Sequence, residues 1–124
     1  MALKPSYNDK LHLPGLSKTE ILILALEASQ KLEWNIEEVT PEGARFEVPF
    51  NMYSHGEEIT FTIEPGSDGE VAVRSQSSSV QFVDYGKNRK NIQKLRETME
   101  EIKTSLTPEE LTQKAKDFCL LYTL

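Results

Sequence analysis

Apolar residues change their spacing along the chain, from a helical period to a strand period and back to a helical one. The first helical stretch spans residues 17–32 and begins with a capping box, since Ser17 is followed three residues later by Glu20. Leu16 precedes this box and is placed to close it against Ile21 as a hydrophobic staple. Apolar side chains cover more than one face of the stretch, so we expect a helix that is buried on two sides.

From Trp34 onward, apolar residues recur at every second position, which is typical of strands with one buried face. Turn residues divide this region into four such segments, with clear turn signatures at residues 41–43 and 65–69. A sheet whose strands share this alternation is antiparallel and is covered on one side only. The alternating apolar residues are Trp34 and Ile36, then Ala44, Phe46, Val48 and Phe50, then Ile59, Phe61 and Ile63, and finally Val71 and Val73.

Two further helices are predicted in the last third of the chain. Apolar residues from Ile92 to Leu106 recur at spacings of three and four and form one narrow stripe, so this helix packs with a single face. The sequence Thr107-Pro108-Glu109-Glu110 predicts the start of a third helix, with Thr107 as its N-cap. The apolar end of that helix, residues 118–124, either completes an inward face or docks on a partner.

The expected fold class is α+β, a four-stranded antiparallel meander with one N-terminal and two C-terminal helices packed on one face. Residues 1–15 lack periodicity and are expected to form a loose N-terminal lead-in. Residues 16–124 are expected to form a single α+β domain, because a chain of 124 residues supports one core but not two.

The charge balance narrows the classes of function. The chain has 14 Lys and Arg residues against 20 Asp and Glu residues, a formal net charge of -6, which disfavours nucleic-acid binding because that function needs a basic surface. The longest apolar run, residues 21–26, is far shorter than the ~20 residues that span a bilayer, and no signal peptide is visible. A single cysteine, Cys119, excludes an internal disulfide and is expected to be an inert core thiol in a reducing compartment. We therefore expect a soluble cytoplasmic protein with no nucleic-acid partner and no direct membrane insertion.

The stretch SSSVQFVDYGKNRKNI, residues 77–92, has two interpretations. In the structural one, Asp84 is the N-cap of the second helix and the serines finish an edge strand. In the functional one, the amides of the helix N-terminus bind an anion and basic side chains supply charge. The structural interpretation is favoured, because Asp84 would occupy the place of an anion. The candidate anion-binding residues are Gly86, Lys87, Asn88, Arg89 and Lys90.

No combination of residues indicates catalysis, a metal site or a cofactor. Ser54 and His55 stand near Glu57 and Glu58, but adjacent residues of a loop rarely point at one another. The second histidine, His12, lies in the expected lead-in, and the chain lacks the ligand spacing of a zinc site. We therefore expect no enzymatic activity, no metal and no cofactor.

The expected interaction surface is the polar face of the sheet or the loop at residues 52–55. Its candidate residues are Arg45, Arg74, Tyr53 and His55. The leading hypothesis is a non-enzymatic interaction or regulatory module that contacts another protein through this surface. The alternative is a small-ligand or anion-binding domain that uses the start of the second long helix or a cavity between the sheet and the helices.

Four motifs follow one another along the chain. They are Trp34-Asn35-Ile36, Ser54-His55-Gly56-Glu57, Asp84-Tyr85-Gly86-Lys87-Asn88-Arg89-Lys90-Asn91-Ile92 and Leu106-Thr107-Pro108-Glu109-Glu110-Leu111. In this order they resemble the small soluble domain that precedes the membrane region in some rhomboid-like proteases of Bacteroidetes-type bacteria, over roughly residues 14–116. The resemblance implies a cytosolic accessory module of unknown biochemical role. It assigns no catalytic or ligand-binding residue, because the protease activity belongs to the membrane-embedded part.

Overall fold

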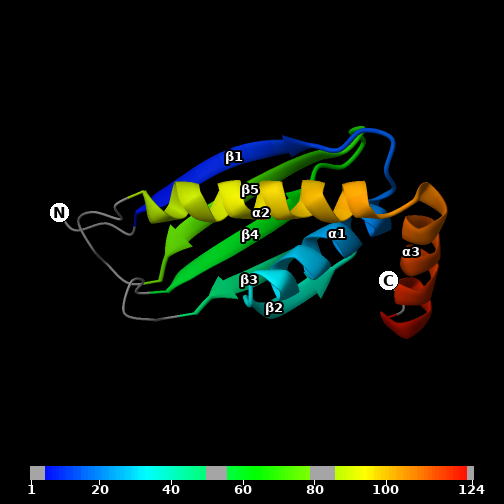
Figure 1. Ribbon diagram of the computed structural model, residues 1–124. Helices are drawn as coiled ribbons and strands as arrows, with labels where there is room; N and C mark the ends of the chain where they lie inside the picture. Colours follow the sequence, from blue (N-terminus) through cyan, green and yellow to red (C-terminus); the bar gives the residue numbers. More distant parts are fainter. Residues whose placement is uncertain (1–4, 50–55, 79–85, 123–124) are drawn as a thin grey trace.

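The computed structural model describes residues 5–49, 56–78 and 86–122, and within them one antiparallel sheet of five strands packs with three helices (Figure 1). The elements are β1 (Ser6–His12), α1 (Lys18–Lys31), β2 (Asn35–Thr40), β3 (Gly43–Val48), β4 (Glu57–Ile63), β5 (Glu70–Ser77), α2 (Lys87–Ser105) and α3 (Pro108–Tyr122). The strand order is β1-β5-β4-β3-β2, so β1 and β2 are the two edges of the sheet. The α+β class and the antiparallel sheet are therefore confirmed.

The number of strands was predicted wrongly, because the sheet has five strands and not four. Residues 6–12 were expected to belong to a loose lead-in, but they form β1 and pair with β5 from Ser6↔Gln76 to His12↔Glu70. Leu11 is the one buried residue of this strand, so no apolar alternation marks it in the sequence. A strand that gains its place through backbone pairing with a distant segment leaves little trace in a hydrophobic pattern.

One face of the sheet carries the core. Successive side chains of a strand point to opposite faces, and in β3, β4 and β5 the apolar ones share the face that meets the helices. Thr60, Thr62 and Arg74 point to the other face and are exposed. The buried apolar residues of the three strands are Ala44, Phe46, Ile59, Phe61, Ile63, Val71 and Val73.

Strand β2 contains an irregularity that sets its apolar side chains apart. Ile36 pairs with Phe46 and Val39 pairs with Ala44. The chain therefore advances by three positions in β2 where it advances by two positions in β3. The register shift between Ile36 and Glu38 is a β-bulge. Because of the extra residue, Ile36 and Val39 lie on the same side of the sheet although their spacing is odd.

The helices are arranged around α1. Helix α2 packs on β5 and β1, α1 packs on β2 and β3 beside α2, and α3 packs on α1 (Figure 1). The prediction that α1 is buried on more than one side is confirmed, since Ile21, Leu22, Leu24 and Ala25 are all inaccessible. Its predicted capping box is also present, with the Glu20 amide donating to Ser17 Oγ at 3.1 Å.

Helix α3 begins with a second capping box. The Glu110 amide donates to Thr107 Oγ1 at 3.1 Å, and the Thr107 amide donates to Glu110 Oε1 at 3.0 Å. This confirms the predicted start of the helix at Pro108. Leu111, Ala115 and Phe118 form its buried face.

Candidate functional site

The start of α2 differs from the structural interpretation of the sequence. The helix begins at Lys87, and its N-cap is Gly86 in the left-handed conformation, with φ of 76°. The prediction that Asp84 is the N-cap is therefore wrong, and Asp84 itself lies outside the described residues. A left-handed residue next to a helix end favours glycine, because a Cβ is strained there.

Buried polar side chains join the start of α2 to the sheet, and we call this set the polar junction. It consists of Glu57, Ser75, Ser77, Asn88 and Asn91, all of which are buried. Ser75 Oγ donates to Asn88 Oδ1 at 2.7 Å, and Asn88 Nδ2 donates to Ser77 Oγ at 3.2 Å. Asn88 Nδ2 also donates to the Pro5 carbonyl at 3.1 Å. The side chain of Asn88 therefore links α2 both to β5 and to the residue that precedes β1.

Asn91 completes the polar junction one turn further along α2. Its Nδ2 donates to Glu57 Oε1 at 2.9 Å and to Ser75 Oγ at 3.2 Å. Buried polar groups are tolerated where they are hydrogen-bonded, and such a network fixes one arrangement of the packed elements. The polar junction therefore positions α2 on β4 and β5.

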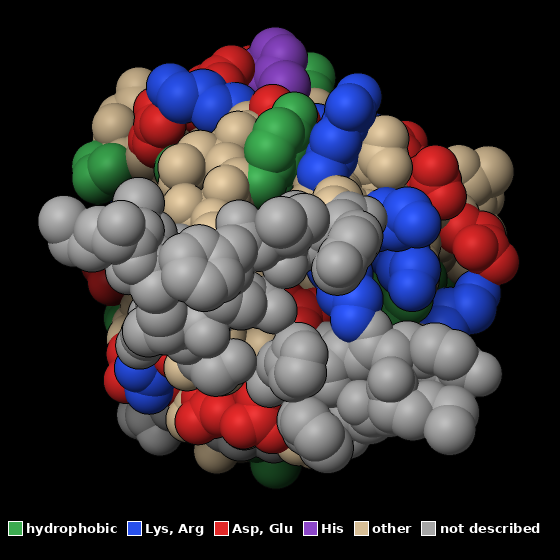
Figure 2. Space-filling model, turned by 90° about the vertical axis from the view of Figure 1, so that its left-hand side faces the viewer, with side chains coloured by type: hydrophobic (Ala, Val, Ile, Leu, Met, Phe, Trp, Pro, Cys, Tyr) green, Lys and Arg blue, Asp and Glu red, His purple; other side chains and the backbone are tan. Residues whose placement is uncertain are grey.

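The five residues of the predicted anion site differ in their accessibility. Asn88 is wholly buried and its side chain serves the polar junction. Gly86, Arg89 and Lys90 are exposed and Lys87 is half-buried, so these four remain accessible candidates. Figure 2 looks onto this end of the molecule and shows Lys and Arg side chains gathered on its α2 side. Anion binding by these residues stays a prediction.

The predicted interaction surface is described in part. Arg45 and Arg74 lie on the polar face of the sheet, where Arg45 Nη2 is 3.6 Å from Glu38 Oε2 and Arg74 pairs across the strands with Asn8 and Thr60. Tyr53 and His55 lie outside the described residues. The role of this surface in protein binding also stays a prediction.

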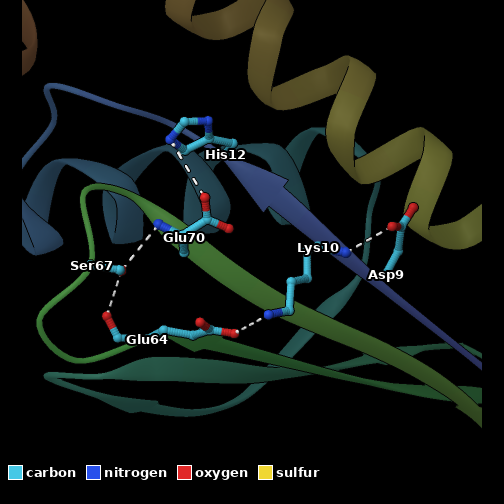
Figure 3. Close-up of polar contacts among 6 residues, drawn as sticks. All are labelled: Asp9, Lys10, His12, Glu64, Ser67 and Glu70. Atoms are coloured by element: carbon cyan, nitrogen blue, oxygen red, sulfur yellow. Dashed lines mark hydrogen bonds and ion pairs between the residues drawn. The ribbon is translucent and has the colours of Figure 1, made fainter.

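Contacts between polar side chains anchor β1 to the β4–β5 hairpin (Figure 3). Lys10 Nζ lies 3.1 Å from Glu64 Oε1, and His12 Nε2 lies 3.5 Å from Glu70 Oε1. His12 is therefore a surface residue of an edge strand. Across residues 5–49, 56–78 and 86–122, His, Cys, Asp and Glu side chains nowhere form a group of three or more that would hold a metal ion.

An apolar groove lies at the other side of the molecule, between α1, β2 and α3, and we call it the α3 groove. It has a volume of about 490 Å³. Its lining comes from three elements: Ile23, Leu26, Glu27 and Gln30 of α1, Ile36 and Val39 of β2, and Lys114, Asp117, Phe118 and Leu121 of α3. The bulge in β2 contributes to this site, because it turns both Ile36 and Val39 toward α1.

Large apolar side chains of the α3 groove face solvent. Leu121 is 77% exposed and Ile36 is 39% exposed, whereas Ile23, Leu26 and Phe118 are buried beneath them. Leu120, which is 83% exposed, lines a separate hollow together with Cys119. Cys119 is half-buried, and its Sγ lies 3.8 Å from Thr19 Oγ1. Ile36 and Leu121 line the same groove, and contiguous exposed apolar surface of this kind is typical of a site that meets another molecule.

One ion pair crosses the α3 groove. Lys114 Nζ donates to Glu27 Oε1 at 2.8 Å, and this hydrogen bond raises the pKa of Lys114 above its ordinary value. The second carboxylate oxygen, Glu27 Oε2, is buried and accepts no hydrogen bond from the described residues.

Comparison with known protein families assigns the chain. The model of the family described as "Protein of unknown function (DUF1499)" matches residues 6–99. The chain belongs to the DUF1499 family. No curated protein matches it.

The DUF1499 match includes the polar junction but only part of the α3 groove. It includes every strand of the sheet, α1, most of α2 and the whole polar junction, but it ends before α3. The α3 groove therefore combines family elements with a helix that lies beyond the matched range. No helix in the described parts of the chain is both long and apolar enough to span a bilayer.

The polar junction as a unit was not predicted from the sequence. Asn88 and Asn91 continue the apolar stripe of α2 toward its start, because Asn88 lies four positions before Ile92 and Asn91 four positions before Leu95. That position on the inward stripe is the signal that marks both amides as buried. Their partners Ser75 and Ser77 follow Val73 at every second position, so all three lie on the inward face of β5.

Proposed function

We propose that this chain is a non-enzymatic binding module that holds part of another protein in the α3 groove. The observation that carries the proposal is the exposure of Leu121 and Ile36 above a buried apolar floor. Burial of apolar surface is the main favourable term in protein association, and the apolar centre of an interface is commonly rimmed by polar groups. Glu27, Gln30, Lys114 and Asp117 supply such a rim.

The chemistry of the groove favours binding over catalysis. Its described lining contains no Ser, Cys or Thr nucleophile beside a base, and Lys114 is held by Glu27. Catalysis requires a reactive group within hydrogen-bond reach of a partner that activates it. We therefore retain the expectation that the chain is not an enzyme as part of the proposal.

The setting of the module is a further part of the proposal. The resemblance to the domain that precedes rhomboid-like proteases suggests a cytosolic accessory role beside a larger protein. A natural coding sequence that continues into membrane helices would support that setting. A coding sequence with no such segment in any relative that shares both the DUF1499 region and α3 would count against it.

A small ligand is the alternative occupant, because a groove of about 490 Å³ lies within the size range of small-molecule sites. A ligand that binds only the folded chain raises its melting temperature, so a thermal-shift screen of metabolites tests this alternative. Stabilisation by one compound that Leu121→Asp abolishes would replace the protein partner with a small molecule.

Selection from a displayed random peptide library tests the proposed function directly. The library is selected on the wild-type chain, and enriched peptides are then titrated against two variants, Leu121→Asp and Leu120→Asp. Both changes place a carboxylate at an exposed position of the same helix, but only Leu121 lines the α3 groove. We expect Leu121→Asp to weaken binding at least about tenfold, since a charge would enter the apolar contact, and Leu120→Asp to leave it within about twofold.

Two outcomes of this experiment would contradict the proposed function. Enriched peptides that bind wild type and Leu121→Asp equally well would show that binding occurs elsewhere on the surface. A selection that enriches no peptide above background would also count against a peptide-binding groove.

A further inference from the structure

The two helices that line the α3 groove present the same pattern of residues to it. Helix α1 contributes residues 23, 26, 27 and 30, and α3 contributes residues 114, 117, 118 and 121. Each set has the spacing i, i+3, i+4, i+7, which is one stripe along a helix. We propose that the occupant of the groove is an amphipathic helix of a partner protein that carries a basic residue beside its apolar stripe. This inference rests on the proposed function and specifies the partner.

The layer structure of the fold favours a helix in this position. Helices α2 and α1 lie side by side against the sheet, and the α3 groove runs along the flank of α1 that faces away from α2. A third helix against that flank would extend the helical layer toward the β2 edge and cover Ile36 and Val39. Helix-in-groove recognition uses apolar anchors at the same i, i+3, i+4, i+7 spacing. The stripe on α1 runs from residue 23 to residue 30, a rise of ~10 Å, so it matches about two turns of a partner helix.

The edge of β2 is unsuited to the other common mode, in which a partner adds a strand to the sheet. The bulge between Ile36 and Glu38 interrupts the regular register of the strand. Glu37 and Glu38 are exposed at the same place. Bulges and edge charges are the means by which proteins prevent strand addition at a sheet edge. The apolar residues of β2 therefore serve as a wall of the groove, and its backbone edge is protected.

The charge of the groove specifies the basic residue. Two carboxylates, Glu27 and Asp117, and one ammonium, Lys114, line it, so its described charges are acidic in balance. Glu27 Oε1 is already bound to Lys114 and Glu27 Oε2 is closed to solvent, so Asp117 is the groove carboxylate that a partner can reach. A guanidinium or ammonium group from the partner would donate to the exposed carboxylate of Asp117, and such charge-assisted hydrogen bonds are the stronger kind.

The test uses synthetic helical probes of about 16 residues, because shorter helices are marginal in water. The arginine probe is an alanine-rich peptide with leucines at i, i+3 and i+7 and one arginine beside that stripe. The glutamate probe replaces the arginine by glutamate. The scattered probe has the composition of the arginine probe, but its leucines lie around the whole helix. Binding is measured by calorimetry and by amide chemical shifts of the chain, and helix formation by circular dichroism.

We expect the arginine probe to bind with a gain in helicity and to shift amides of residues 23–30 and 114–121. The scattered probe should bind at least about tenfold more weakly, because it cannot bury its leucines together. The glutamate probe should bind about tenfold more weakly than the arginine probe. In the variant Asp117→Asn this difference should fall to about twofold, whereas the variant Glu101→Gln, which neutralises a carboxylate in an exposed ion pair with Lys31, should preserve it.

The contrary results separate the inference from the proposed function. Library peptides that bind in a Leu121-dependent way as extended chains, with new protection of the β2 amides, would keep the proposed function and overturn the helical partner. Equal binding of the arginine and scattered probes would overturn it as well. A dimer in sedimentation that Leu121→Asp dissociates would show that a second copy fills the groove. If neither library peptides nor probes bind in a Leu121-dependent way, the proposed function and this inference fail together.

Discussion

Helices α2 and α3 rest on the same fold in very different ways. The inward stripe of α2 is closed, since Ile92, Leu95 and Met99 are almost inaccessible and its buried amides bond to the sheet. Helix α3 rests on α1, and it leaves Leu120 and Leu121 in solvent beside a groove. The DUF1499 match covers most of α2 and stops before α3.

The difference indicates that the residues beneath α2 contribute to stability and that the exposed residues of α3 contribute to binding. Side chains beneath α2 are packed and hydrogen-bonded within the chain, so changing them should alter the free energy of unfolding. Apolar side chains of α3 that remain exposed gain little from folding, so changing them should alter binding instead. Substitutions beneath α2 should therefore change the free energy of unfolding and spare binding, whereas substitutions at the exposed residues of α3 should change binding and spare stability.

The substitution Leu95→Ala should have the largest effect. Leu95 is wholly buried between α2 and the sheet, and removing its side chain leaves a cavity that typically costs about 2–5 kcal/mol. Urea unfolding followed by circular dichroism measures the loss. Its matched control is Leu121→Ala, which should change the free energy of unfolding by less than about 0.5 kcal/mol. Similar losses in both variants would contradict the comparison.

The substitution Asn88→Ala tests the polar junction and should rank second. It removes the amide that bonds Ser75 and the Pro5 carbonyl in a buried setting, so we expect a loss of about 1–3 kcal/mol by the same urea measurement. Asn35→Ala is the control, because Asn35 bonds Glu47 at the exposed face and its loss should remain within about 0.5 kcal/mol. A neutral Asn88→Ala would mean that the junction does not hold α2 in place.

The substitution Thr107→Ala sharpens the comparison at the level of local stability. It removes the N-cap of α3, which is typically worth about 1 kcal/mol. Because α3 packs mainly on α1, we expect faster hydrogen exchange confined to the α3 amides. Ser17→Ala removes the equivalent cap of the buried helix α1, so its loss should appear in global unfolding. Equal changes of exchange throughout the chain in both variants would exclude a separable α3.

The smallest effect should come from Asp9→Asn, which removes an edge contact of α2. Hydrogen bonds from the Arg96 guanidinium and then from the Lys10 amide hold the pKa of Asp9 below its ordinary value of 3.8. A lowered pKa in the folded state stabilises the protein above that ordinary value, and the contribution is lost as the pH falls through the lowered pKa. Because the pair is half-exposed, we expect at most about 0.5 kcal/mol.

Unfolding of wild type and Asp9→Asn at neutral pH and near pH 2 checks this prediction. The difference in the free energy of unfolding should be present at neutral pH, should decline in high salt, and should vanish in acid. A difference that grows as the pH falls would contradict the assigned direction of the pKa shift.

Local features of the fold were predictable from the sequence. The capping boxes at Ser17 and Thr107 each lie within four residues of chain, so their residues identify them without tertiary information. The buried faces of β3, β4 and β5 follow from alternation, since each strand covers the core with one face.

Features that depend on distant pairing were not predictable. Strand β1 is mostly polar and acquires its place by pairing with β5, whose first residue, Glu70, follows His12 by 58 positions. The β2 bulge becomes visible only when its register with β3 is known, and it brings Val39 to the same side as Ile36. The α3 groove requires the position of α3 on α1, which no spacing within either helix specifies.

Hydrogen exchange of the whole chain, with and without a peptide from the library selection, tests the central claim most directly. We predict that the peptide slows exchange in residues 23–30 and 114–121 and leaves the amides of β4, β5 and the first turn of α2 unchanged. Slowed exchange concentrated at residues 86–90, or around Arg45 and Arg74 on the polar face of the sheet, would contradict the account and return the binding site to one of those surfaces.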